Sequence, residues 1–204
     1  MTNDALFDRL KHPNPNLRER AMLELAENMD DTTIPRLMGI LAAENMTYRR
    51  AAVKALGVIG FDAVPSLVDS LEKSDNPTVR TSCTKALAQV AVNYPEDPFP
   101  AEGIAALKKA VSDSNPVVNI AAVMALGAIG ASVVDILIDT LRTTDNIAVS
   151  VAIINALGSI ADSKAAKILT ELARDDRADT YVKESARSAL SRLEMVSNFQ
   201  GRKS

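Results

Sequence analysis

The chain has 204 residues, a formal net charge of −3, one Cys and one His. The negative charge gives no general attraction to nucleic acid or to anionic lipid, and a lone Cys cannot form an intramolecular disulfide. Only 3% of the residues are aromatic and none is Trp, so the core must consist of Ala, Leu, Val and Ile, which suits closely packed helices.

Six polar residues and six Leu residues recur along the chain with the same spacing of 31, 31, 39, 31 and 33 residues. The polar set is Asn14, Asn45, Asn76, Asn115, Asn146 and Asp179, and the apolar set is Leu25, Leu56, Leu87, Leu126, Leu157 and Leu190. A single globular core has no reason to show such a period, whereas a stack of similar units requires it.

Each unit predicts two helices. The first carries two apolar anchors four residues apart, namely Leu6 and Leu10, Leu37 and Leu41, Leu67 and Leu71, Leu107 and Val111, Leu137 and Leu141, Ile168 and Leu172. The recurring Asn or Asp suits the N-cap of the second helix, and Pro15, Pro77 and Pro116 suit its first position. Glycines are expected to end several second helices, at Gly57, Gly60, Gly127, Gly130 and Gly158.

One helix pair is too small to bury its own apolar face, so neighbouring pairs must stack. We therefore predict an all-α, right-handed α-solenoid of about six repeats and about twelve helices over residues 1–195, followed by a disordered tail at 196–204. Residues 114–134 carry no charge over a length that could span a bilayer, but they fit the same repeat as their charged neighbours. We expect no membrane span.

The repeat also resembles a known family. Asn76, Pro77, Val79, Arg80, Ala86 and Leu87, together with the ending Ala55, Leu56, Gly57, Ile59 and Gly60, resemble HEAT repeats of the phycobilisome-lyase type over residues 4–194. The resemblance implies a HEAT solenoid, but these motifs are structural and do not identify an activity.

The largest difference between units is an insertion at residues 93–100, which contains three Pro together with Tyr94 and Phe99. Insertions in repeat proteins often emerge on a binding face, so both aromatic residues are candidates for partner or ligand binding. In the alternative interpretation, the two rings fold back and cover the stack.

A second difference lies on the expected concave face of the second helices. One sector is basic, with Arg50, Lys54 and Lys85 flanked by Arg49 and Arg80, and the next is apolar, with Ile120, Met124 and Val151 beside Asn155. We interpret these residues as a groove for a partner with an acidic edge and an apolar body, or for a carboxylated ligand such as a tetrapyrrole with propionates. Alternatively, Arg49 and Arg80 bond to an Asp or Asn of a neighbouring repeat, and curvature buries Ile120 and Met124.

The sequence offers little support for catalysis or metal binding by this chain alone. His12 is expected in a solvated turn, and Cys83 occupies a position that is Ala in other units, which predicts a small core residue. The acidic pairs Asp30–Asp31 and Asp175–Asp176 are expected to act as caps or solvated charge rather than as paired catalytic carboxylates. We predict no catalytic residue, no metal ligand and no resident cofactor.

The family resemblance implies several functions. Our main prediction is a non-catalytic scaffold or assembly factor that binds a protein partner, such as an IscA-type scaffold in iron–sulfur assembly. The alternative is a phycobilin lyase subunit or bilin chaperone, with phycocyanobilin as bound substrate and a phycobiliprotein or second lyase subunit as partner, or a phycobilisome disassembly factor. An exposed Ile120, Met124 and Val151 patch would also allow a homodimer. The charged start of the chain predicts no signal peptide and a cytoplasmic location.

Overall fold

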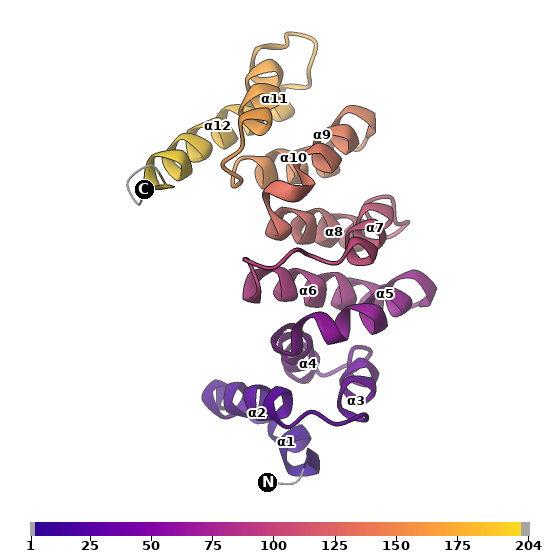
Figure 1. The fold of residues 1–204 in the computed structure, drawn as a ribbon. Coiled ribbons are helices and arrows are strands. Elements are labelled where there is room, and N and C mark those ends of the chain that lie inside the picture. Colours follow the sequence, from indigo (N-terminus) through magenta and orange to yellow (C-terminus); the bar gives the residue numbers. More distant parts are fainter. Residues whose placement is uncertain (1–2, 201–204) are drawn as a thin grey trace. The chain divides into compact units, whose positions relative to one another are not determined.

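The computed structural model describes residues 3–200, and for residues 196–200 the backbone alone. Within this range the chain forms twelve α-helices and two short 3-10 helices, with no strand (Figure 1). The helices are α1 (Asn3–Arg9), α2 (Pro15–Glu27), α3 (Thr33–Ile40), α4 (Met46–Ile59), α5 (Val64–Lys73), α6 (Pro77–Asn93), α7 (Ala101–Ala110), α8 (Pro116–Ile129), α9 (Val134–Thr143), α10 (Ile147–Leu157), α11 (Ser163–Arg174) and α12 (Thr180–Gln200), with the 3-10 helices η1 (Gly60–Ala63) and η2 (Ala131–Val133).

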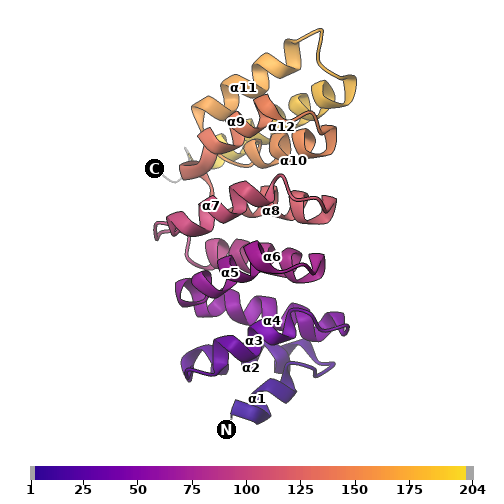
Figure 2. The same ribbon diagram turned by 90° about the vertical axis from the view of Figure 1, so that its right-hand side faces the viewer.

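The helices fall into two compact units, Met1–Ala110 and Val111–Ser204. In the first unit α2, α4 and α6 pack in one row and α3, α5 and α7 in a second, and Figure 2 views this unit from the side of the second row. In the second unit α8, α10 and α12 form one row, while α9 and α11 form the other. The predicted all-α solenoid of helix pairs is confirmed.

The recurring polar residues start the second helices. The side-chain oxygens of Asn14, Asn45, Asn76, Asn115 and Asn146 accept hydrogen bonds from backbone N–H groups of the first turns of α2, α4, α6, α8 and α10. The Asp179 carboxylate accepts from the backbone N–H groups of Tyr181 and Val182 in α12. Each cap satisfies donors that the helix itself cannot pair, so the predicted N-caps are confirmed.

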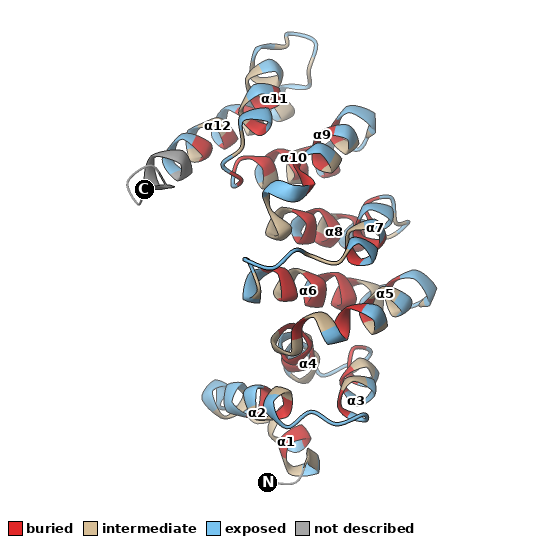
Figure 3. Cartoon of the chain, in the orientation of Figure 1, coloured by how far each residue is buried: buried red, intermediate tan, exposed pale blue. Residues whose placement is uncertain are grey.

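The recurring apolar residues form the core. Leu25, Leu56, Leu87, Leu126 and Leu157 are completely buried, and Figure 3 shows the buried residues on the helix faces turned toward neighbouring helices. In the last pair Leu172 and Leu190 are only half-buried. No helix follows α12 in the described residues, so one face of this pair lacks a neighbour.

The glycines have two functions, and the expectation that all of them end helices is only partly correct. Gly60 and Gly130 follow the last residues of α4 and α8 with φ of 83° and 88°, a region that L side chains avoid. Gly57, by contrast, lies inside α4, where a Cβ would come within 2.3 Å of Gln89 on α6. Gly127 is likewise inside α8, where a Cβ would be 2.9 Å from the Ala156 Cβ on α10. These two glycines therefore allow successive second helices to approach closely.

One stretch of the described residues, Met46–Lys73, has the length and apolar composition of a membrane span. Half of its most apolar window is buried inside the structure, as expected for core helices. The stretch is also interrupted at Gly60, where α4 ends and a 3-10 turn leads into α5. The stretch Met46–Lys73 is therefore only weak evidence for a membrane-spanning helix. Residues 114–134, the uncharged stretch noted in the sequence, contain α8 and the start of α9 in separate helices.

The predicted end of the solenoid at residue 195 falls inside α12, which continues to Gln200. Residues 201–204 of the predicted tail lie outside the described residues, and its disorder stays a prediction.

Replacing Leu126 with Ala should lower the free energy of unfolding by about 2–5 kcal/mol, because the side chain is completely buried and its loss leaves a cavity. Urea denaturation followed by circular dichroism measures this change. An unchanged midpoint would contradict the packing described for α8.

Candidate functional site

An equivalent side chain in successive repeats closes the turn between the two helices. Arg18 donates to the carbonyl oxygen of His12 at 2.5 Å, Arg80 donates to that of Ser74 at 2.9 Å, and Arg49 donates to that of Ala43. Asn119 donates in the same way to the carbonyl oxygens of Val111 and Asp113. The contacts therefore favour the structural interpretation of Arg49 and Arg80. These acceptors are carbonyls of the preceding turn, and they hold the two guanidinium groups in place.

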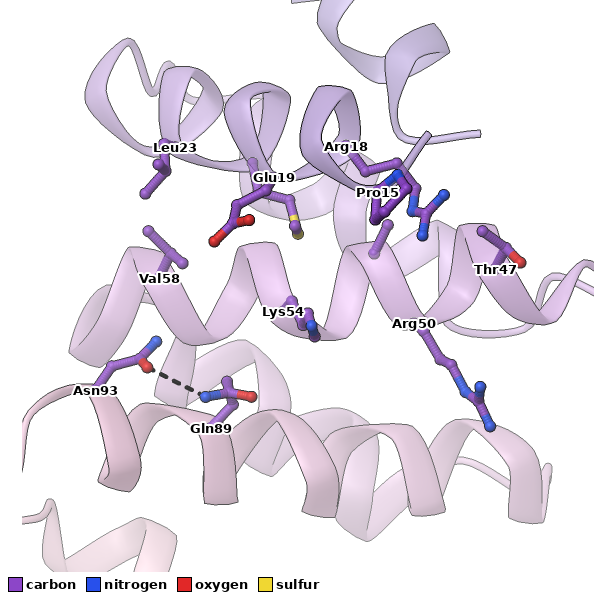
Figure 4. A pocket seen from close by; sticks show the side chains of 12 residues that line it. Pro15, Arg18, Glu19, Leu23, Thr47, Arg50, Lys54, Val58, Gln89 and Asn93 are labelled. Carbon is purple, nitrogen blue, oxygen red and sulfur yellow. Dashed lines mark hydrogen bonds between the residues drawn. The ribbon is translucent and has the colours of Figure 1, made fainter. Parts of the chain in front are cut away.

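A pocket of about 460 Å³ lies in the first unit, between α2, α4 and α6 (Figure 4). Two predicted residues, Arg50 and Lys54, line it from α4. They are four residues apart, so their positions are one helical turn apart on the same face. Among the described residues, neither forms an ion pair or a side-chain hydrogen bond. The structure therefore brings two uncompensated cations to one pocket.

The opposite wall of the pocket is formed by α2. Glu19 lines the pocket from this helix, and Figure 4 shows its carboxylate directed toward α4. Glu19 has no hydrogen-bond or ion-pair partner among the described residues. Glu19 is not among the residues that the sequence predicts for the site, because a Glu on an exposed helix face is usually only solvated.

One end of the pocket has apolar side chains from α2 and α4, with polar amides of α6 beside them. Leu23 and Val58 face each other there across the pocket (Figure 4). Asn93 donates to the Gly57 carbonyl oxygen at 2.9 Å and accepts from Gln89 Nε2 at 3.1 Å. The first of these hydrogen bonds connects the end of α6 to the end of α4, and the two together fix the amides that line the pocket.

The remaining predicted groove residues lie elsewhere. Lys85 is exposed on α6 but does not line the pocket. Ile120 and Met124 lie on α8 in the second unit, and Val151 and Asn155 lie on α10. Met124 is 67% exposed, which argues against its burial by curvature, while Ile120 and Val151 are half-buried. Asn155 accepts a hydrogen bond from Arg192 on α12 at 2.5 Å. A single groove joining these residues to Arg50 and Lys54 stays a prediction.

The insertion at residues 93–100 folds back onto the stack. The Tyr94 hydroxyl donates to the Val58 carbonyl oxygen at 2.5 Å, and its ring lies 5.4 Å from the Phe61 ring. The Phe99 ring contacts the Phe61 ring edge-on, at 6.2 Å between centroids. These contacts favour the alternative interpretation, in which Tyr94 and Phe99 cover the stack. Binding of a partner by the two rings stays a prediction.

The reactive residue types have structural surroundings. His12 Nδ1 accepts from the backbone N–H of Asn14 at 3.0 Å inside a turn. Cys83 is completely buried, and burial raises the pKa of its thiol to about 12. Hydrogen bonds from Thr32 and Thr33 lower the pKa of Asp30 to about 2 in the turn before α3. No cluster of three metal-ligating side chains occurs in the described residues.

Residues 3–88 and 102–191 match HEAT repeats. The chain belongs to this family. It is 52% identical over 200 residues to the uncharacterized phycocyanin operon protein Z of Pseudanabaena tenuis (strain PCC 7409), an alignment that covers 98% of this chain and 99% of the relative. It is 36% identical over 182 residues to the bilin biosynthesis protein CpeZ of Synechococcus sp. (strain WH8020), covering 86% of this chain and 97% of CpeZ.

Solved structures with the same fold include a chain of the CpcE–CpcF complex of phycocyanin lyase from Nostoc sp. PCC7120. Its TM-score is 0.51 at 19% identity, over 76% of this chain and 96% of that chain. A designed armadillo repeat protein in complex with a peptide has a TM-score of 0.52 at 17% identity, over 95% of this chain and 100% of that chain. At these identities the likeness concerns the fold alone.

The resemblance to HEAT repeats of the phycobilisome-lyase type is confirmed by these relatives. The main functional prediction, an assembly scaffold of the kind that binds an IscA-type partner, is wrong. Both relatives are named for the phycocyanin operon or for bilin biosynthesis, which favours the alternative. The functional prediction was wrong because the repeat motifs specify folding and are shared by HEAT-repeat proteins with different functions.

The adjacent residues Arg49 and Arg50 should respond differently to the same substitution. Arg49→Gln should lower the free energy of unfolding by about 1–3 kcal/mol, because the half-buried guanidinium loses its bond to the Ala43 carbonyl. Arg50→Gln removes an exposed, unpaired charge and should change stability by no more than about 0.5 kcal/mol. Urea denaturation of both variants compares them, and equal losses would contradict the division of roles.

Gly60 and Gly130 form a second matched pair. Substitution of either by Ala should cost about 1–3 kcal/mol of stability through its positive φ. Only at Gly60 would the new Cβ also meet the Tyr94 ring, at 2.7 Å, whereas no atom lies within 4 Å at Gly130. Gly60→Ala should therefore be the more destabilising in denaturant unfolding, and the reverse order would contradict the packing of Tyr94.

Proposed function

We propose that this protein acts in the attachment of a bilin to a phycobiliprotein, as a lyase-type subunit or bilin chaperone. The observation that carries the proposal is the similarity to CpeZ and to the phycocyanin operon protein over nearly the whole length of each chain. The fold shared with a chain of the CpcE–CpcF complex is consistent with this function.

The chemistry of bilin attachment favours a binding role for this chain. Attachment of a bilin to a protein Cys forms a carbon–sulfur bond, and the thiolate is the nucleophile. Cys83 cannot supply that thiolate, since its side chain is completely buried and its thiol pKa is raised to about 12. The acceptor sulfur therefore belongs to the phycobiliprotein, while this chain holds and orients the bilin.

The proposal includes a protein partner. Rows of stacked helices such as those of each unit offer a surface suited to binding another chain. The phycobiliprotein itself is one such partner and a second lyase subunit is another, with a homodimer through the exposed surface around Met124 as the competing arrangement. The cytoplasm is the proposed location.

Co-production in bacteria tests the function. An apo-phycobiliprotein and a bilin-producing pathway are expressed with or without this chain, in the presence and absence of a second lyase subunit. Covalent bilin is measured by zinc-enhanced fluorescence on denaturing gels. We expect the yield of covalent bilin, or the native absorption of the product, to depend on this chain. The same yield and spectrum without it would contradict the proposal.

Cys83→Ala should leave attachment unchanged in this assay. The equivalent core position is Ala in other repeats, at Ala52, Ala122 and Ala186, all completely buried, so the fold should tolerate the change. Attachment lost by a variant with native circular dichroism and melting temperature would show that the thiol takes part, contrary to its burial.

A further inference from the structure

The pocket between α2, α4 and α6 presents both signs of charge to one ligand-sized space. Arg50 and Lys54 line it from α4, and Glu19 lines it from α2. Although all three share the pocket, no ion pair joins Glu19 to either cation in the described residues. Its volume of about 460 Å³ is within the range of small-molecule sites. Such a set of unpaired groups is suited to a ligand that brings charges and donors of its own.

The positive charges of Arg50 and Lys54 favour a ligand that carries carboxylates. Two positions four residues apart on a helix are separated by about 6 Å along its axis, so Arg50 and Lys54 can each take a separate acid group. Beyond Lys54 on the same helix lies Val58, which faces Leu23 of α2 at the apolar end. A matching ligand therefore carries acid groups beside an apolar body.

Glu19 restricts the class of ligand that the pocket can bind. An ionised carboxylate only accepts hydrogen bonds, and it repels a ligand that offers nothing but acid groups and hydrocarbon. A ligand that satisfies Glu19 must also carry hydrogen-bond donors, either N–H or O–H groups. A fatty acid or an inorganic anion lacks this combination, whereas a linear tetrapyrrole has two propionates, pyrrole N–H groups and a conjugated apolar body.

We infer that this pocket is a bilin site in which Arg50 and Lys54 bind the propionates and Glu19 accepts hydrogen bonds from pyrrole N–H groups. The inference rests on the proposed function and deepens it by naming the residues that recognise the ligand. Asn93 and Gln89, fixed by their hydrogen bonds, line the end of the pocket at α6 and offer neutral polar contacts.

The arrangement has a spectroscopic consequence. A carboxylate beside the pyrrole nitrogens favours their protonated, positively charged form, whose absorption differs from that of the neutral bilin. The other charged groups that line the pocket are Arg18 of α2 and Arg50 and Lys54 of α4, while α6 contributes only amides. Arg18 is held by the His12 carbonyl, and the propionates offset the two α4 cations. Glu19 is therefore the group that stabilises the protonated bilin.

Titration of the purified full-length protein with phycocyanobilin tests the carboxylate contacts. Arg50→Gln combined with Lys54→Gln should weaken binding about 10- to 100-fold, since two charge-assisted contacts are lost. The control is Lys108→Gln combined with Arg142→Gln, which removes the same charge at exposed positions outside the pocket and should bind as the unmodified protein does. The dimethyl ester of phycocyanobilin should bind weakly to all of these proteins. Equal affinity of the pocket variant and its control would overturn the site.

A pH titration of the bound bilin tests Glu19. In Glu19→Gln the bilin should lose its protonated absorption band at a pH lower by about one unit or more, because the stabilising carboxylate is gone. Glu27→Gln, at an exposed position of α2 outside the pocket, should leave that midpoint unchanged. An unchanged midpoint in Glu19→Gln would overturn its role. If the unmodified protein binds no bilin but still promotes attachment in the co-production assay, the pocket assignment and the holding of the bilin by this chain both fail, while its part in attachment stands.

Discussion

Every part of this structure depends on the burial of one helix pair by the next. A pair of amphipathic helices of about ten residues each has more apolar surface than it can cover by itself. Within each of the two units, successive helices meet through completely buried Leu residues, and glycines inside α4 and α8 let the second helices come close. The last pair supports this dependence. No described helix follows it, and its Leu172 and Leu190 are only half-buried.

This constraint assigns most of the recurring residues to folding. The Asn caps pair the free N–H groups of each second helix, and the Arg or Asn at the next recurring position closes the preceding turn through backbone carbonyls. Function is then left to positions that the stack does not use. Arg50, Lys54 and Glu19 are such positions, since they are exposed, unpaired among the described residues and gathered at one pocket.

The functional assignment combines similarity with chemistry. Relatives that align over nearly the whole chain connect it with phycocyanin and bilin biosynthesis, and the buried Cys83 limits what this chain can contribute. A protein without a reactive thiol can still control attachment by holding the bilin and its acceptor in position, since orientation alone lowers the barrier of a reaction between two molecules. In the proposed arrangement, the pocket in the first unit holds the bilin. The exposed apolar surface around Met124 in the second unit is available to a protein.

The sequence by itself determined the helix pairs, their caps and their buried faces, because these follow from local spacing at the helical period and from the chemistry of Asn, Pro and Leu at helix ends. It also placed Cys83 in the core and Arg50 and Lys54 on the face that carries the pocket. Only the tertiary structure separated Arg49 from Arg50. Arg49 bonds to the Ala43 carbonyl in the preceding turn, whereas Arg50, about 100° further around the helix, has no partner among the described residues. The tertiary structure likewise placed Tyr94 and Phe99 against Phe61 and brought Glu19 to the same pocket as Lys54, because contacts between repeats depend on packing distances that the sequence period does not contain.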